Sequence, residues 1–237
     1  MLPSGLRNSL RSLPLLCQGN PGRLQEWLMD PTGSRLSACA LAILGGGLSY
    51  GYSLGVWRAG LMGIFVAVKL PLLIALTLLT NGLINGMFAQ LLGSGLTFRQ
   101  TLMAMLMSFA TFALITGALG PVACFFILNA PGPGSPGGDT AYSLILVGHT
   151  VIIAFAGVMA FRRFLPVLQA VAATRQAARL VFMVWLAGNL VVGAQLSWNL
   201  RPFFGQPSRP VEFLRSDWNH SSFYEALWTN ATSFFRD

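Results

Sequence analysis

The stretch of residues 69–100, KLPLLIALTLLTNGLINGMFAQLLGSGLTFRQ, constrains the fold more than any other part of the sequence. Its apolar part reaches the roughly 20 residues that a helix needs to cross a bilayer. Thr77, Asn81 and Asn85 recur every four residues, so they share one face of that helix. Lipid would leave these polar side chains without hydrogen bonds, at a cost of roughly several kcal/mol. We therefore predict a membrane helix whose polar face packs against protein.

Two residues at the start of this stretch predict where the helix begins. Pro71 fits the first turn of a helix, where its missing N–H is no loss. Lys69 precedes it, and we expect its ammonium group to reach the lipid head groups. The sequence thus predicts a span over residues 70–92. The preceding apolar segment, residues 59–68, is too short to cross and is expected to run along the membrane surface.

Four further apolar runs occupy residues 36–57, 102–128, 141–161 and 180–200. The composition agrees with several crossings, because 54% of the residues are hydrophobic and only 9% are charged. We predict an all-α membrane protein, a bundle of about five transmembrane helices with amphipathic interfacial helices at both termini. Its parts are a basic N-terminal segment (1–35), the transmembrane domain (36–200) and an aromatic, proline-containing C-terminal tail (201–237).

The first span carries a row of glycines in its second half. Gly47, Gly51 and Gly55 lie four residues apart, which lets another helix approach closely. Packing within the bundle is the favoured interpretation, and a contact with another molecule is the alternative. Together with Thr77, Asn81 and Asn85, these glycines are the predicted helix-packing residues.

Both ends of the chain predict short amphipathic helices. Asn20 and Pro21 provide a cap and a first helical residue, and Trp27 and Leu28 follow on one side of that helix. This helix either binds a membrane surface or partner subunit or packs on its own membrane domain, and the sequence favours neither.

In the C-terminal tail, Ser222 and Glu225 form a capping-box pattern. The helix that follows places Phe223 and Trp228 on an apolar face at the interface. That face either seals the outer side of the bundle or docks an external partner. Trp27, Leu28, Phe223 and Trp228 are the candidate partner-binding residues.

The basic residues predict the orientation of the bundle. With five spans and an inside N-terminus, nine arginines lie on the inner side, and six basic residues lie on the outer side. The contrast is sharpest in two loops: residues 162–179 contain four arginines, whereas the Pro/Gly-rich loop 130–139 contains no basic residue. We expect a cytoplasmic N-terminus and an external, periplasmic C-terminus.

Three segments carry a resemblance to a known family. The turn LLGSGLTFRQTL and the segments VKLPLLIALTLLTNGLINGMFAQLLG and VGAQLSWNLRPFFGQPSRPVEFLR resemble bacterial multi-pass proteins grouped with the Yip1 family. The likeness covers roughly residues 36–215 and implies a similar fold and topology in the bacterial inner membrane. The family supplies no catalytic motif to carry over, and the basic N-terminus and aromatic tail depart from it.

Catalytic, metal-binding and cofactor-binding residues are not expected. The apolar runs contain no Asp, Glu or Arg, and all seven carboxylates lie outside them. Neither a phosphate-binding loop nor an HExxH motif is present. The one intramembrane imidazole, His149, is interpreted as a hydrogen-bonded packing residue, since no carboxylate or second ligand accompanies it. Haem or chlorophyll binding through this single histidine is the alternative. The sequence therefore favours a protein that is not an enzyme.

Two functions remain. The first is a non-catalytic structural or assembly subunit, a scaffold that binds other membrane-protein subunits and a bilayer with anionic head groups, and no nucleic acid. The second is a channel or facilitator for a small solute, with a polar path between helices. That path would be lined by the neutral polar residues of the spans, Thr77, Asn81, Asn85, His149, Asn189 and Gln195.

Overall fold

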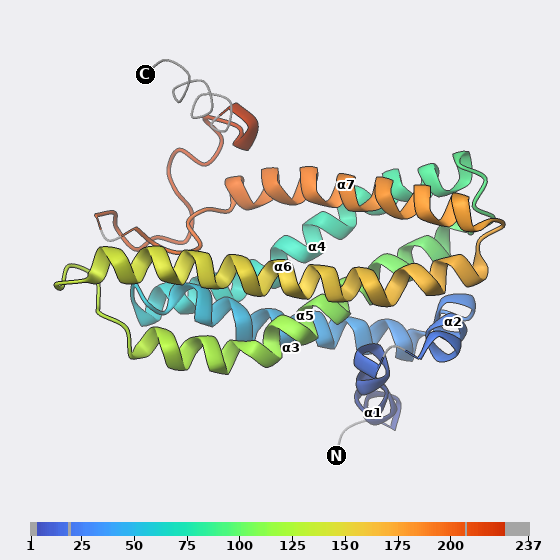
Figure 1. Ribbon diagram of the computed structural model, residues 1–237, viewed down its shortest axis with the longest axis horizontal. Helices are drawn as coiled ribbons and strands as arrows, with labels where there is room; N and C mark the ends of the chain where they lie inside the picture. Colours follow the sequence, from blue (N-terminus) through green and yellow to red (C-terminus); the bar gives the residue numbers. More distant parts are fainter. Residues whose placement is uncertain (1–3, 19, 207, 226–237) are drawn as a thin grey trace.

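The structure, a computed structural model, describes residues 4–18, 20–206 and 208–225. All regular elements within these residues are α-helices (Figure 1). Their bounds are α1 Ser4–Gln18, α2 Pro21–Met29, α3 Gly33–Gly55, α4 Gly60–Leu91, α5 Phe98–Leu128, α6 Gly138–Val171 and α7 Arg175–Asn199.

Four of these helices, α4 to α7, are long and apolar enough to cross a membrane. They correspond to four of the five predicted spans, so the prediction of an all-α membrane protein is confirmed at this level. The remaining predicted span, residues 36–57, corresponds to α3 up to its last residue, Gly55. The second half of α3 is rich in Gly, Ser and Tyr, and α3 is not among these four helices.

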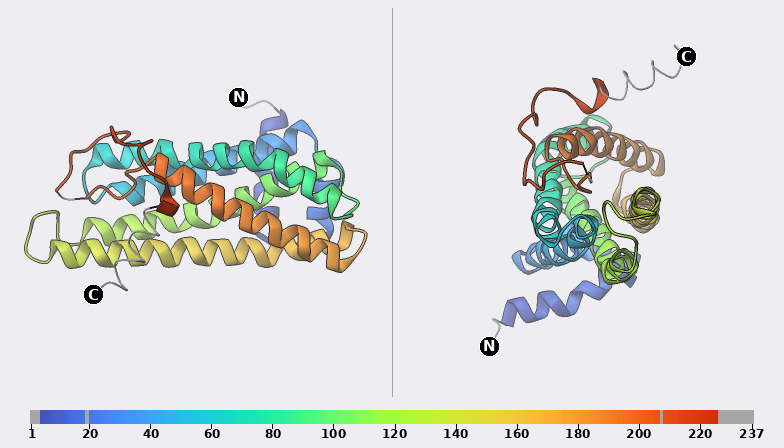
Figure 2. Two further views of the ribbon diagram at one scale, coloured as in Figure 1. Left: turned by 90° about the horizontal axis from the view of Figure 1, so that it is seen from above. Right: turned by 90° about the vertical axis from the view of Figure 1, so that its left-hand side faces the viewer.

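The five long helices run side by side and alternate in direction (Figures 1 and 2). We call one end of the bundle the α2 end, where α1, α2, the α4–α5 turn and the α6–α7 turn lie. The other end, the tail end, carries the α3–α4 turn, the α5–α6 loop and the C-terminal segment, residues 200–225. Helix α3 packs extensively against both α4 and α5, while α7 packs on α4 and α6 packs on α5.

Local sequence explains where several helices begin and end. Asn20 accepts hydrogen bonds from the backbone N–H groups of Gly22 and Arg23 and caps α2, as predicted. Thr97 and Gln100 form a reciprocal capping box at the start of α5. Between α4 and α5, Gly93 and Gly95 adopt positive φ angles of 62° and 76°, which allow the chain to reverse in a short turn.

The start of α4 corrects the sequence prediction. The helix begins at Gly60 and continues unbroken through Pro71, so residues 59–68 do not form a separate surface segment. The reason is packing: Met62 and Val66 are buried against α3 in a cluster with Tyr50 and Leu54. Tertiary burial of this first part extends the helix beyond the position where Pro71 favours a start.

Candidate functional site

The glycine row of α3 lies against α4. A Cβ atom on Gly51 would lie 2.6 Å from the carbonyl oxygen of Val66, and one on Gly55 would lie 2.6 Å from that of Met62. At Gly47 the nearest atoms belong to the ring of Pro71, at 3.1 Å. The row therefore faces the protein's own helix and leaves no room there for a partner.

A second set of small residues joins α3 to α5, and the sequence analysis did not identify it. A Cβ atom on Gly46 would overlap the backbone of Ala113, and one on Gly117 would lie 2.5 Å from the Cα of Gly46. Ser49 Oγ also donates a hydrogen bond of 3.1 Å to the Gly117 carbonyl. The four-residue spacing of Ala113 and Gly117 was the available signal.

The polar face of α4 is buried, and its members bond in different ways. Asn81 Nδ2 donates to Asn189 Oδ1 on α7 at 2.9 Å, and Asn85 Nδ2 approaches the sulfur of Met105 on α5 at 3.6 Å. Thr77 donates to the carbonyl of Leu73 in its own helix. The amides thus face protein, and Asn81 forms a direct bond between two candidate spans.

The remaining candidate path residues do not join this face. His149 Nδ1 lies 3.0 Å from the hydroxyl of Tyr50, between α6 and α3. Its Nε2 is buried and has no hydrogen-bond partner among the described residues. Gln195 bonds to Asn199 and to the backbone N–H of Phe223 at the tail end. The six residues therefore divide among three separate places in the fold.

Lys69 corrects a second prediction. Its side chain is fully buried and does not extend to the membrane surface. Nζ donates a hydrogen bond of 2.9 Å to the carbonyl oxygen of Pro202 in the C-terminal segment. The ammonium group also lies 5.0 Å from the ring centre of Phe213, within the range of a cation–π interaction. The C-terminal segment folds over Lys69 and supplies the partners that head groups were expected to supply.

Trp27 and Leu28 also differ from the prediction. They are 5% and 1% exposed and belong to the main hydrophobic core, to which α6 also contributes. In the described chain both side chains are therefore covered by the protein's own residues. Their burial agrees with the second interpretation of this helix, in which it packs on the protein's own membrane domain.

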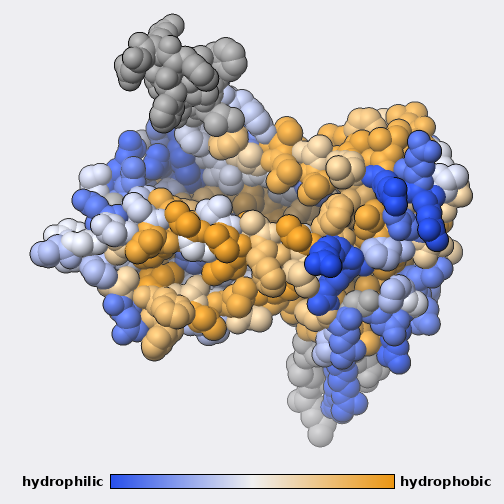
Figure 3. All heavy atoms as spheres, in the orientation of Figure 1, coloured by the Kyte–Doolittle hydropathy of each residue, from blue (hydrophilic) through white to orange (hydrophobic). Residues whose placement is uncertain are grey.

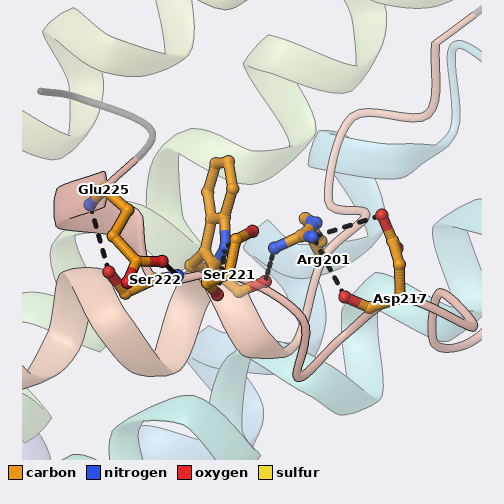
Figure 4. Close-up of polar contacts among 6 residues, drawn as sticks. Arg201, Asp217, Ser221, Ser222 and Glu225 are labelled. Atoms are coloured by element: carbon orange, nitrogen blue, oxygen red, sulfur yellow. Dashed lines mark hydrogen bonds and ion pairs between the residues drawn. The ribbon is translucent and has the colours of Figure 1, made fainter. Parts of the chain in front are cut away.

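The C-terminal segment is held to the end of α7 by polar contacts (Figure 4). Arg201 forms an ion pair of 3.5 Å with Asp217 and lies over the ring of Trp198, 4.0 Å from its centre. Ser222 and Glu225 form the predicted reciprocal capping contacts, at 2.9 and 3.0 Å. Phe223 is half-buried beside Trp198, with ring centres 6.2 Å apart. The predicted partner residue Trp228 lies outside the described residues.

Helix α6 exposes a band of mostly small side chains along one face. Its members, alternately four and three residues apart, are Ser143, Val147, Thr150, Ala154 and Gly157, and all are exposed. We call this set the α6 seam. A Cβ atom on Gly157 would meet no atom of the described chain within 4 Å. No other helix of the described chain covers the seam.

Two cavities open near the tail end. One, of about 680 Å³, lies between α5 and α6 and is lined almost wholly by apolar residues. The other, of about 620 Å³, lies between α3, α4, α6, α7 and the C-terminal segment, and three arginines contribute to its wall. We call the second one the arginine cavity. The surface between α6 and α7 is recessed in this region (Figure 3).

The described residues contain no cluster of three His, Cys, Asp or Glu side chains placed to hold a metal ion.

Comparison with known proteins finds no matching family model, no matching curated protein and no matching solved structure. The resemblance to the Yip1 family therefore remains a prediction based on three sequence segments.

Proposed function

We propose that this protein is a non-catalytic, five-span membrane protein that acts as a structural or assembly subunit and holds another membrane-protein chain against α6. We place it in the bacterial inner membrane, with a topology like that of Yip1-family proteins. Amphipathic segments at both termini complete this proposed architecture.

The α6 seam is the observation that carries the proposal. Small side chains at alternating spacings of four and three residues are the pattern through which two helices pack closely. Four of its five members, Ser143, Thr150, Ala154 and Gly157, are small, and Val147 is the largest side chain in the seam. A helix that only faced lipid would have no need of a separate small-residue band, so the seam favours a protein neighbour.

The polar groups of the spans support a scaffold over a facilitator. Asn81 is paired with Asn189, Thr77 bonds within its own helix, and Tyr50 is bonded to His149. The two bonds between helices lie at different contacts, α4 with α7 and α3 with α6, whereas a conducting path needs its polar groups along one continuous route. Bonds of this kind between neutral groups suit helix association.

Two features support the fifth crossing and the orientation. Helix α3 has 23 residues, a length of about 35 Å at 1.5 Å per residue, which exceeds the hydrocarbon core of about 30 Å. The α6–α7 turn and its flanking arginines lie at the α2 end, and the Pro/Gly-rich α5–α6 loop lies at the tail end. We infer that the α2 end is cytoplasmic.

A matched pair of substitutions tests the proposal. Gly157→Leu places a large side chain on the α6 seam, and Gly45→Leu places the same side chain on exposed α3, in equally open space. Both variants should fold, because a Cβ atom at either position would meet no atom of the described chain within 4 Å. The mass of the particle extracted from native membranes into polymer discs should fall to that of one chain for Gly157→Leu alone. Equal particle masses for the parent and both variants would overturn the proposal.

A further inference from the structure

The arginine cavity combines apolar walls with a strongly basic rim. Leu54, Leu70, Leu73 and Ile153 contribute apolar surface from α3, α4 and α6. Arg201, Arg209 and Arg215 contribute the charge, and among the described lining residues there is no carboxylate. The volume of about 620 Å³ falls within the range typical of small-molecule sites.

The three arginines differ in whether the protein neutralises them. Arg201 is paired with Asp217 and bonded to the backbone. The guanidinium groups of Arg209 and Arg215 have no hydrogen-bond or ion-pair partner among the described residues, and Nε of Arg215 is buried. Two cationic groups at one cavity are thus left to bind an anion from outside the chain.

Electrostatics agrees with this geometry. Burial lowers the pKa of Arg215, and the neighbouring charges of Arg209 and Arg201 lower it further, while the smaller effects of Asp217 and Glu212 raise it. Burial and the two like charges disfavour the charged form, yet an arginine stays protonated at neutral pH. An anion between Arg209 and Arg215 would relieve the repulsion between them.

The position of the cavity selects the kind of anion. It opens where α6 and α7 diverge near the tail end, and hydrophobic residues border the recess between these helices (Figure 3). A ligand that fits both the walls and the rim has a hydrocarbon chain and an anionic head. Arg is well suited to the head, since its planar group donates two parallel hydrogen bonds to phosphate oxygens.

We propose that the arginine cavity binds an anionic phosphate-bearing membrane lipid, with its phosphate between Arg209 and Arg215 and its acyl chain against Leu73 and Ile153. The lipid enters sideways from the bilayer between α6 and α7. It would tie the C-terminal segment to the spans, because Arg209 and Arg215 belong to the former and Leu73 and Ile153 to the latter.

Native mass spectrometry of the full-length chain in a neutral detergent tests this site. Phosphatidylglycerol should bind about tenfold more tightly than phosphatidylcholine with the same acyl chains, as expected for a charge-assisted contact. Arg209→Gln combined with Arg215→Gln should remove that preference. Arg175→Gln combined with Arg179→Gln, at exposed arginines of the opposite end, should leave it unchanged. Equal affinity for the two lipids, or equal loss in both double variants, would overturn the proposal.

Further variants cover misfolding and a soluble ligand. Arg209→Gln alone alters an exposed side chain, so it should fold and weaken phosphatidylglycerol binding several-fold. Ile153→Trp should obstruct the acyl chain and weaken lipid binding, whereas Val158→Trp, elsewhere on exposed α6, should not. The competing ligand is inorganic phosphate, which would make the cavity a site for soluble anions. In that case it binds as tightly as the lipid, Ile153→Trp changes neither of the two affinities, and the lipid assignment is wrong. Full lipid affinity in Arg209→Gln would contradict it as well.

Discussion

At the scale of single residues, Gly51 is one of two glycines of the row at which a Cβ atom would lie 2.6 Å from a carbonyl oxygen of α4. We expect Gly51→Leu to destabilise the protein by about 1–3 kcal/mol or more, because even a Cβ atom would lie 2.6 Å from the Val66 carbonyl oxygen. Thermal unfolding in detergent measures the loss, with Gly45→Leu as the control in open space. Gly51→Leu melting together with Gly45→Leu would remove the row's role in packing.

Single residues also explain where sequence reasoning failed. Lys69 was expected at the head groups, but its partner is the carbonyl of Pro202, more than a hundred residues away. Trp27 and Leu28 have the same pattern whether they face a partner or their own core. Local sequence does not contain the tertiary contacts that decide these positions.

At the scale of elements, the direct bond between Asn81 and Asn189 links α4 to α7. Replacing each with Ala, singly and together, should give a coupling energy of about 0.6–2 kcal/mol for the pair. Unfolding in mixed micelles provides the measurement. Thr77→Ala serves as the control with Asn189→Ala, because Thr77 bonds to its own helix and should show no coupling. Coupling of equal size in both cycles would contradict the assigned contact.

Substitution of Asn81 also distinguishes the scaffold function from the facilitator function. In liposomes, the purified protein should pass no small solute. The Asn81→Leu variant should therefore show the same absence of solute flux as the parent. A solute flux that Asn81→Leu abolishes would favour the facilitator over the scaffold.

The elements themselves were largely predictable from the sequence. Four of the predicted spans correspond to helices long and apolar enough to cross a membrane, because length and hydropathy are local properties. The extension of α4 to Gly60 was not predictable in this way, since it depends on burial of Met62 and Val66 against α3. The arginine cavity was missed for a similar reason: its walls come from α3, α4, α6, α7 and the C-terminal segment.

At the scale of the whole molecule, the proposed topology places the α5–α6 and α6–α7 connections on opposite sides of the membrane. Single cysteines at Ser135 and Thr174, both exposed, should react with an impermeant reagent from opposite sides. The parent for this experiment has its three native cysteines, Cys17, Cys39 and Cys124, replaced by Ala. Reaction of both positions from the same side would contradict the arrangement of spans.

What lies against the α6 seam decides whether this protein holds another chain. A photo-crosslinking amino acid at Ala154, within the seam, can be compared with one at Val122, an exposed position of α5. After illumination of native membranes, we expect Ala154 to give a discrete adduct containing a second protein chain and Val122 to give lipid adducts. Lipid adducts alone from both positions would contradict the scaffold function.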